Sequence, residues 1–279
     1  PAGAFVISAT GHNESEPALC FVKEAGEFTV VWAEVHGVTN WDIYGRQVEA
    51  TGSVIGDRFV ISAAPEWQSE AAAAANGANG EALIVWQDFR SPPYRIYGSR
   101  VTPGGTVLDT AGVAISNQSA DHEQPAAAFD GANYLVVWGD TRNSPGENDV
   151  YGARVTSDGN VLDPAGFVIA QAANDQILPA VALDGSNSLV VWADYRDSTR
   201  YHIYGARVTP DGDVLDPAGI TITTAPGFQY APAVASDGAN SLVLWQDTRS
   251  GSDWDIYGTR VSLTVGLAVA VLATSIGLA

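Results

Sequence analysis

The chain has 279 residues, with 32 Asp and Glu against 13 Lys and Arg, and a formal net charge of −19. So acidic a surface repels phosphate backbones and anionic lipid headgroups, which argues against nucleic acid and against peripheral membrane binding. The single cysteine, Cys20, cannot form an intrachain disulfide and is expected in the core. No methionine is present, even at position 1, and lysine is scarce. These features predict an extracellular or cell-surface protein, secreted with removal of a signal.

A repeat runs through the chain, marked by a Trp that ends an apolar run. Its copies are separated by 54, 52, 54 and 53 residues. The Trp residues are Trp32, Trp86, Trp138, Trp192 and Trp245, and the Tyr-Gly pairs that follow begin at Tyr44, Tyr97, Tyr151, Tyr204 and Tyr257. Units of this length cannot bury a core alone, so the repeat predicts one array of stacked supersecondary units.

The predicted elements are strands in groups of four. In chain order they include Phe5–Ser8, Pro17–Val22, Gly166–Ile169, Ile220–Ile222, Ala231–Ser236, Leu242–Trp245 and Ile256–Val261. The run at Leu242–Trp245 is continuously apolar, which is typical of a strand buried on both faces. Asp-Gly pairs at 158–159, 211–212 and 237–238 predict tight turns, because Gly takes positive φ without a steric penalty.

Five such groups predict an all-β, five-bladed β-propeller over residues 1–261. The Trp245 unit has no fourth strand in its repeat pattern, whereas Phe5–Ser8 matches the fourth strands of other units. We therefore expect this N-terminal strand to complete the Trp245 blade and close the ring. Residues 262–279 are uncharged and apolar. They form an extension that we expect to pack on a neighbouring subunit or to anchor in a membrane, with an added strand as a further alternative.

A W-x-D-x-R motif recurs in the second strand of four units. Residues i, i+2 and i+4 of a strand share one face, so the motif predicts a Trp followed by an ion pair. Identical placement in each unit favours a structural network over a ring of ligand pockets. The structural repeat comprises Trp32, Trp86, Trp138, Trp192, Trp245, Asp88, Asp140, Asp194, Asp247, Arg90, Arg142, Arg196 and Arg249. The first unit has Glu34 and His36 in place of the Asp and Arg.

The D-x-R…D-I-Y pattern over residues 28–261 resembles the repeats of TolB-like propellers and of secreted surface proteins. This resemblance implies a scaffold for protein–protein or surface contacts and carries over no catalytic residue. The number of blades also resembles tachylectin-type lectins and five-bladed glycosidases, without a sequence motif of either.

Catalytic residues in a repeat protein are expected where the repeat is broken. The breaks are Glu34, His36, Trp67, Arg95, His122, Glu123 and His202. Their spacing indicates neither a carboxylate pair nor a metal-binding cluster, so no catalytic, cofactor or metal residue is predicted. Calcium is an alternative at the hairpin tips, near Asp158, Asn160 and Asp163 and near Asp211, Asp213 and Asp216. The turn interpretation is favoured there, since short hairpins supply too few oxygen ligands.

The resulting functional prediction is a non-enzymatic structural or adhesive protein that assembles with copies of itself, into a filament if strand exchange does not close. The predicted assembly residues are Phe5, Val6, Ile7, Leu263, Val265, Leu267, Val269, Val271, Leu272, Ile276 and Leu278. The alternative is a multivalent, lectin-like propeller that binds cell-surface glycan through Trp41, Trp67 and Trp254. A five-bladed glycosidase ranks third.

Overall fold

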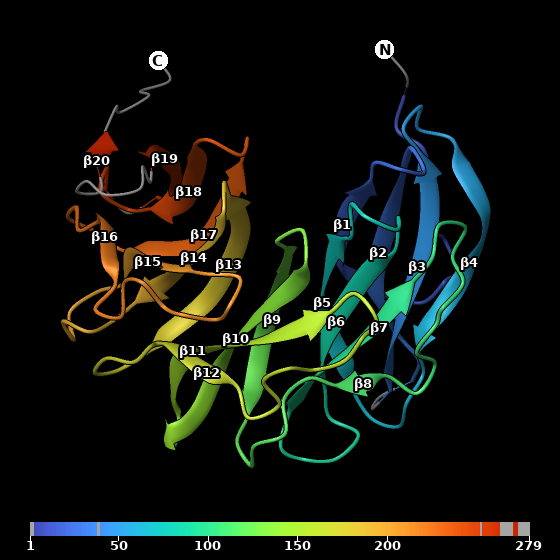
Figure 1. Ribbon diagram of the computed structural model, residues 1–279, viewed down its shortest axis with the longest axis horizontal. Coiled ribbons are helices and arrows are strands. Elements are labelled where there is room, and N and C mark those ends of the chain that lie inside the picture. Colours follow the sequence, from blue (N-terminus) through green and yellow to red (C-terminus); the bar gives the residue numbers. More distant parts are fainter. Residues whose placement is uncertain (1–2, 38–39, 252, 263–269, 273–279) are drawn as a thin grey trace. The chain divides into compact units, whose positions relative to one another are not determined.

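The computed structural model describes residues 3–37, 40–251 and 253–262, and the backbone of 270–272. All regular elements among these residues are β-strands, arranged as five antiparallel sheets of four strands (Figure 1). The described part of the chain contains no helix long and apolar enough to cross a membrane. The chain divides into two compact units, residues 1–115 and 116–279.

The first unit contains two sheets. The first sheet is β1 (Glu14–Val22), β2 (Glu27–Val35), β3 (Trp41–Glu49) and β4 (Val54–Ser62), and the second is β5 (Gln68–Ala75), β6 (Ala82–Asp88), β7 (Arg95–Val101) and β8 (Val113–Ala114). The core of this unit lies between the two sheets, where Val31 and Ile43 pack in one cluster with Ile84 and Trp86.

The second unit contains three sheets. The third sheet is β9 (His122–Phe129), β10 (Asn133–Ser144), β11 (Glu147–Thr156) and β12 (Phe167–Ala170). The fourth sheet is β13 (Gln176–Asp184), β14 (Asn187–Asp194), β15 (His202–Val208) and β16 (Ile220–Thr223). The fifth sheet is β17 (Gln229–Ser236), β18 (Ser241–Asp247), β19 (Asp255–Ser262) and β20 (Ala270–Leu272). Trp192 packs in the cluster that joins the third sheet to the fourth, and Trp245 in the cluster that joins the fourth to the fifth.

The Tyr-Gly pair recurs because its glycine lies where the third strand is closely covered. A Cβ on Gly152 would lie 2.8 Å from Ile169 Cδ1 and 3.2 Å from the Val136 carbonyl oxygen. Central strand β14 is buried along its apolar run, as that kind of run predicts. The same prediction is wrong for β18, where Leu242 and Leu244 are 48% and 38% exposed because this strand has one covered face.

The first strands of neighbouring sheets lie side by side within each unit: β1 beside β5, and β13 beside both β9 and β17. Each first strand carries a register irregularity near its start. One residue there has a left-handed backbone: Glu16 (φ 55°), Glu70 (53°), Gln124 (56°), Leu178 (53°) and Ala231 (48°). These five bulge residues are 54, 54, 54 and 53 positions apart, so the bend belongs to the repeat.

The prediction that Phe5–Ser8 completes the Trp245 blade is wrong. These residues form no strand; Ile7 packs against the first sheet, and its carbonyl accepts a 2.6 Å hydrogen bond from Arg46 Nη1. The fourth strand of the fifth sheet is β20, which pairs with β19 from Ser262 opposite Ala270. Pairing two segments that are close in the sequence costs less chain entropy than pairing opposite ends of the chain, which favours β20.

The C-terminal extension falls largely outside the described residues. Val271 and Leu272 lie in β20, so part of the extension does add a strand to its own sheet. The other predicted assembly residues of this segment, Leu263, Val265, Leu267, Val269, Ile276 and Leu278, lie outside the described residues.

Candidate functional site

The W-x-D-x-R residues form a hydrogen-bonded network within a single sheet. In the fourth sheet, Trp192 Nε1 donates to Asp194 Oδ2 at 2.8 Å, and Arg196 Nε and Nη2 donate to the two carboxylate oxygens at 2.8 and 2.6 Å. Arg196 Nη1 donates to the Ala218 carbonyl at 2.9 Å, and the guanidinium lies 4.0 Å from the ring centroid of Tyr204. The network therefore fastens the end of β14 to β15 and to the loop before β16, and its polar groups face one another.

The same network recurs around three other tryptophans, Trp86, Trp138 and Trp245. Each carboxylate is buried and each arginine stacks on the tyrosine of the next strand. Ion pairs of this kind hold a sheet together and leave little of the carboxylate for a ligand.

The first sheet builds this network differently. Its carboxylate is Glu34, and the guanidinium comes from Arg58 on β4, which donates to Glu34 Oε2 and lies 4.2 Å from the ring centroid of Tyr44. His36 therefore occupies the arginine position of the motif, although Arg58 supplies the guanidinium that binds the carboxylate. Among the described residues, the buried Trp32 Nε1 has no hydrogen-bond partner, in contrast to the other four repeat tryptophans.

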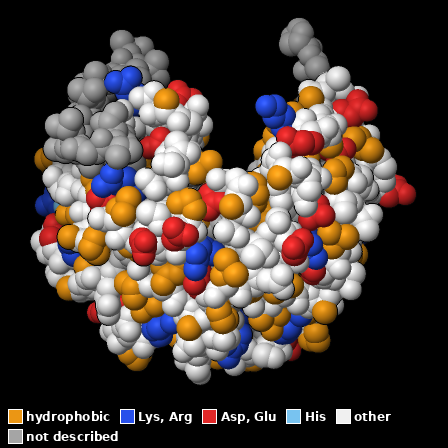
Figure 2. Space-filling view, in the orientation of Figure 1, with side chains coloured by type: hydrophobic (Ala, Val, Ile, Leu, Met, Phe, Trp, Pro, Cys, Tyr) orange, Lys and Arg blue, Asp and Glu red, His pale blue; other side chains and the backbone are white. Residues whose placement is uncertain are grey.

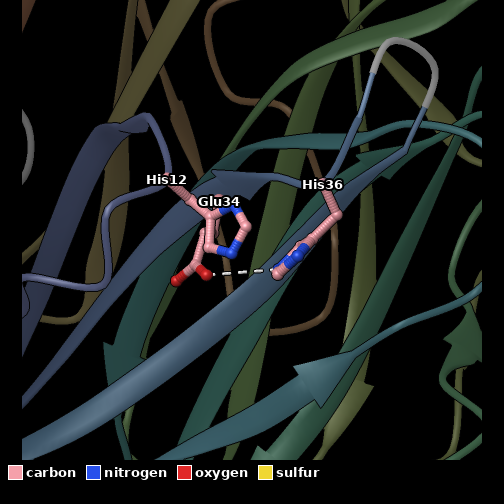
Figure 3. Close-up of side chains that lie close together, drawn as sticks. All are labelled: His12, Glu34 and His36. Carbon is pink, nitrogen blue, oxygen red and sulfur yellow. Dashed lines mark ion pairs between the residues drawn. The ribbon is translucent and has the colours of Figure 1, made fainter.

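His36 instead belongs to a cluster with His12 and Glu34 (Figure 3). His36 Nε2 lies 3.2 Å from Glu34 Oε1, and the rings of His12 and His36 are 4.6 Å apart between centroids. Asp42 Oδ2 lies 3.8 Å from His36 Nε2. Burial raises the pKa of Asp42, although the nearby His36 and a hydrogen bond from Asn40 act in the opposite direction.

A second group of chemically active side chains lies at the same end of the first unit. Register places Glu14 opposite Glu34 and Glu34 opposite Asp42, so β1 starts where β2 ends and β3 begins. An isolated bridge joins Trp41, at the start of β3, to Trp67, just before β5. We call Glu16, Glu70, Trp41 and Trp67 the Glu–Trp site.

Glu16 and Glu70 are equivalent bulge residues of adjacent first strands. Glu16 Oε2 accepts a 2.6 Å hydrogen bond from the Glu70 backbone N–H. The same link recurs in the second unit, where Gln124 Oε1 accepts from the Leu178 N–H at 2.9 Å. In the first unit, however, the residue that donates carries its own carboxyl group, so two carboxyl-bearing residues are in direct contact. Glu16 is exposed and Glu70 is half-buried.

The two tryptophans of the site form an aromatic pair. Their ring centroids are 6.2 Å apart at an interplanar angle of 35°, and Trp67 is 41% exposed. Trp254, the third predicted sugar-stacking residue, lies in the second unit beside Tyr230, with 6.5 Å between centroids. The structure thus brings two of the three predicted residues together. Figure 2 shows acidic side chains interspersed with apolar ones over the described surface in view.

Three further breaks in the repeat, His122, Glu123 and His202, lie in the second unit. His122 is fully buried, 2.5 Å from Ser116 Oγ and 3.2 Å from Asp140 Oδ2. His202 Nδ1 lies 2.6 Å from Gln229 Oε1. Both histidines are therefore held within the fold. Glu123, on β9, is half-buried; burial, and then the charge of Asp121, raise the pKa of its carboxyl.

Two of the hairpin aspartates considered for calcium, Asp163 and Asp216, are bound by arginines. Arg154 Nε donates to Asp163 Oδ2 at 2.8 Å, and Arg207 Nε donates to Asp216 Oδ2 at 2.8 Å. Backbone N–H groups of the same arginines bind the same carboxylates. These bonds lower the pKa of Asp163 and Asp216 more than burial raises it. Ion pairs therefore fasten both hairpins.

No family model and no curated protein matches the sequence. Solved structures do match the fold. A thermostable family-43 glycoside hydrolase superimposes with a TM-score of 0.56 at 12% identity, over 96% of this chain and 95% of its own. An α-L-arabinofuranosidase from Lactobacillus brevis gives 0.54 at 11%, over 92% and 93%. A GH43 β-xylosidase/α-arabinofuranosidase from a compost microbial metagenome, in a calcium-free xylotriose complex, gives 0.51 at 11%, over 95% and 96%.

These likenesses confirm the predicted all-β, five-bladed β-propeller. They support a propeller without supporting the more specific resemblance to TolB-like repeats. They contradict the prediction of a non-enzymatic, structural or adhesive protein, because these three solved structures, which share the fold over more than nine-tenths of the chain, are described as glycoside hydrolases. Self-assembly stays a prediction. The prediction started from the regularity of the repeat and did not single out Glu16 and Glu70. Aligning the first strands at the repeat spacing would have revealed them as polar positions in a column that ends in Leu178 and Ala231.

Proposed function

We propose that the chain hydrolyses glycosidic bonds, with Glu16 and Glu70 as its two carboxyl residues. The observation that carries the proposal is the 2.6 Å hydrogen bond from the Glu70 N–H to Glu16 Oε2, which places two glutamates on consecutive bulges of one unit. Glycosidases use a pair of carboxyl groups, one as general acid and the other as base or nucleophile. A left-handed bulge turns a side chain away from the regular alternation of its strand, which suits a residue that must reach a substrate.

The environments of the two glutamates suggest different roles. Glu70 is half-buried, and a low-dielectric setting suits a carboxyl that donates a proton to the leaving oxygen. Glu16 is exposed and already accepts an N–H, as the base or nucleophile would. Trp67 and Trp41 supply aromatic faces at the same end of the unit, and aromatic rings pack well against the apolar faces of sugars.

The substrate class proposed for the first tests is a pentose-containing polysaccharide. Solved structures with this fold are described as arabinofuranosidases and xylosidases, which supports starting with arabinofuranosides and xylosides. An acidic, lysine-poor surface and a glycan substrate both suit an extracellular protein, and we propose that location. The TolB-like resemblance of the D-x-R…D-I-Y pattern remains a hypothesis about the scaffold and plays no part in the site.

The test is hydrolysis of nitrophenyl α-L-arabinofuranoside and β-D-xyloside by the wild type and by Glu16→Gln and Glu70→Gln. Each substitution removes an ionisable carboxyl at nearly constant volume, so we expect kcat to fall by about 10²- to 10⁴-fold without unfolding. Glu24→Gln is the matched control, since Glu24 is an exposed glutamate in the turn between β1 and β2. Wild-type rates in both site variants would contradict the proposal.

The Trp pair favours glycan binding as a second candidate function. Trp67 is 41% exposed beside Trp41, an arrangement suited to stacking on a sugar even without catalysis. If the wild type binds xylo- or arabino-oligosaccharides but hydrolyses none, and Trp67→Ala abolishes binding, the chain is a glycan-binding module. Absence of both hydrolysis and binding would reject both candidates.

A further inference from the structure

We propose that His12, Glu34 and His36 bind a divalent transition-metal ion, with zinc the best-suited ion. Each residue offers one ligand atom, and these atoms lie within 4.8 Å of one another (Figure 3). His12 precedes β1, Glu34 lies in β2 and His36 follows it, so the three residues come from two segments that meet at one end of the first sheet. The proposal is independent of glycan hydrolysis.

Two of the three atoms that face the centre of the cluster, those of Glu34 and His36, make no hydrogen bond among the described residues. Among the described residues, Glu34 Oε1 and His36 Nε2 are both buried and neither makes a hydrogen bond; their one close contact is the 3.2 Å ion pair with each other (Figure 3). A buried carboxylate oxygen without a donor is costly, because desolvation is not repaid. The other oxygen, Oε2, is held by Arg58, which fixes the carboxylate with Oε1 directed toward the imidazoles. A cation between Oε1 and the ring nitrogens would satisfy both orphaned atoms.

The structural network of the sheet also does not require the two histidines of the cluster. In the other four sheets an Arg occupies the position of His36 and binds its Asp. In the first sheet Arg58 supplies this guanidinium from β4, so packing does not require a histidine at position 36. Nor does packing require His12, whose side chain is exposed and turned toward His36. Two imidazoles around one buried carboxylate are better explained by ligation.

The donor set indicates the class of ion. Two imidazole nitrogens and one carboxylate oxygen suit zinc and neighbouring first-row metals, whereas calcium and magnesium prefer all-oxygen shells. Tetrahedral zinc with bonds of about 2.1 Å places its ligands about 3.4 Å apart, so a small rotation of exposed His12 would complete the geometry. Water would take the fourth position, or Asp42, whose Oδ2 lies 3.8 Å from His36 Nε2.

The test is isothermal titration of the wild type with zinc chloride, with cobalt chloride as a spectroscopic substitute. We expect one ion per chain and visible cobalt bands typical of a tetrahedral site. His12→Ala should weaken zinc binding by about 100-fold or more, since an exposed ligand is removed without disturbing the core. Asn13→Ala, a neighbouring exposed residue, should bind as the wild type does.

His36→Arg provides a second variant that restores the residue found in the other four sheets. It should fold, as checked by its circular dichroism, and lose the cobalt bands. Failure of the wild type to bind zinc, or unchanged affinity in His12→Ala, would overturn the proposal. Equal weakening in Asn13→Ala and His12→Ala would overturn it as well, since the effect would then not depend on the imidazole.

Discussion

The first and fourth sheets bring the same kinds of group together from differently placed residues. Both hold a Trp, a buried carboxylate, a guanidinium and a Tyr that lies under the guanidinium. In the fourth sheet the guanidinium is Arg196, two residues after Asp194 in the chain, and it binds both carboxylate oxygens. In the first sheet it is Arg58, from another strand, and it binds Glu34 through one oxygen.

The difference separates what the fold requires from what the sequence is free to vary. A guanidinium over the Tyr is common to both sheets, so the fold requires the charge and the plane of that group. Its position in the chain is not fixed. Because the guanidinium comes from Arg58 on β4, the end of β2 in the first sheet can carry His36. The loop around the end of β2 is then available for other chemistry. The predictions that follow test this division.

The largest effect should follow from removing the shared carboxylate in the fourth sheet. Asp194→Ala leaves Arg196 and Trp192 Nε1 without their acceptor, so we expect the free energy of unfolding to fall by about 3–5 kcal/mol. Urea unfolding followed by Trp fluorescence measures this. Asp213→Ala, at an exposed hairpin tip, is the control and should change little. A loss below about 1 kcal/mol would mean that the network is dispensable.

Removing the guanidinium from the first sheet should have the next largest effect. Arg58→Ala leaves the buried Glu34 without its cation, and we expect a loss of about 2–3 kcal/mol. His36→Ala, at the arginine position of the motif, should cost less than about 1 kcal/mol in metal-free buffer, because Arg58 supplies the guanidinium over Tyr44 and His36 makes only a tilted ring contact with Tyr44. A larger loss of unfolding free energy in His36→Ala than in Arg58→Ala, measured by urea unfolding, would show that position in the repeat matters more than the contact with Glu34.

Acid should weaken the sheets that carry the motif arginine. Burial alone would raise the pKa of Asp247, but hydrogen bonds from Arg249 and Trp245 outweigh it and hold the pKa below the ordinary 3.8. The folded state therefore binds this proton less readily than the unfolded state, and the stabilisation present above pH 3.8 is lost as pH falls toward the folded pKa.

The unfolding free energy of wild type and Asp247→Asn, measured between pH 7 and strongly acidic pH, checks this. The difference in unfolding free energy between the wild type and Asp247→Asn should shrink as the pH falls. This change should be smaller than the loss caused by deleting the side chain, because the side chain remains in place. Asp158→Asn, at an exposed turn, serves as the control. A constant or growing advantage of the wild type would contradict the direction of the pKa shift.

The smallest effect concerns the bend that all five sheets share. Ala231 has φ of 48°, a conformation that L-residues adopt at a cost and glycine adopts freely. Ala231→Gly should raise stability by about 0.5 kcal/mol, measured as an increase in Tm. Ala235→Gly, an exposed residue of the same strand outside the bend, should lower stability by about as much. Destabilisation by both would mean that the bend is not strained.

The repeat predicts much of the fold because its markers are tied to local geometry. Asp211-Gly212 and Asp158-Gly159 mark hairpins whose glycines have φ of 88° and 83°. The apolar run before Trp192 becomes the buried part of β14. The pairing of the fifth sheet could not be predicted in the same way, because the fourth-strand pattern recurs at Phe5–Ser8 and not at residues 270–272, and sequence similarity says nothing of loop entropy.

The candidate site is less accessible from sequence. Arg58 lies off the motif, and its contact with Glu34 depends on the order of the strands, because Arg58 reaches from β4 across β3 to β2. Glu16 and Glu70 look like ordinary exposed glutamates until their positive φ and their mutual hydrogen bond are known. Trp41 and Trp67 could be identified as candidate sugar-binding residues by type, but their pairing follows from a single bridge between strands of different sheets.

The bend at the start of each first strand has a consequence for how such a chain can change. The left-handed backbone at Glu16, Glu70, Gln124, Leu178 and Ala231 costs a similar amount of energy for any of these residues, because the strain lies in φ and not in the side chain. Replacing one side chain by another there alters chemistry while the scaffold keeps its shape. Copies of one duplicated unit can therefore diverge at this residue first, and an activity can be gained or lost by a single substitution in an otherwise regular repeat.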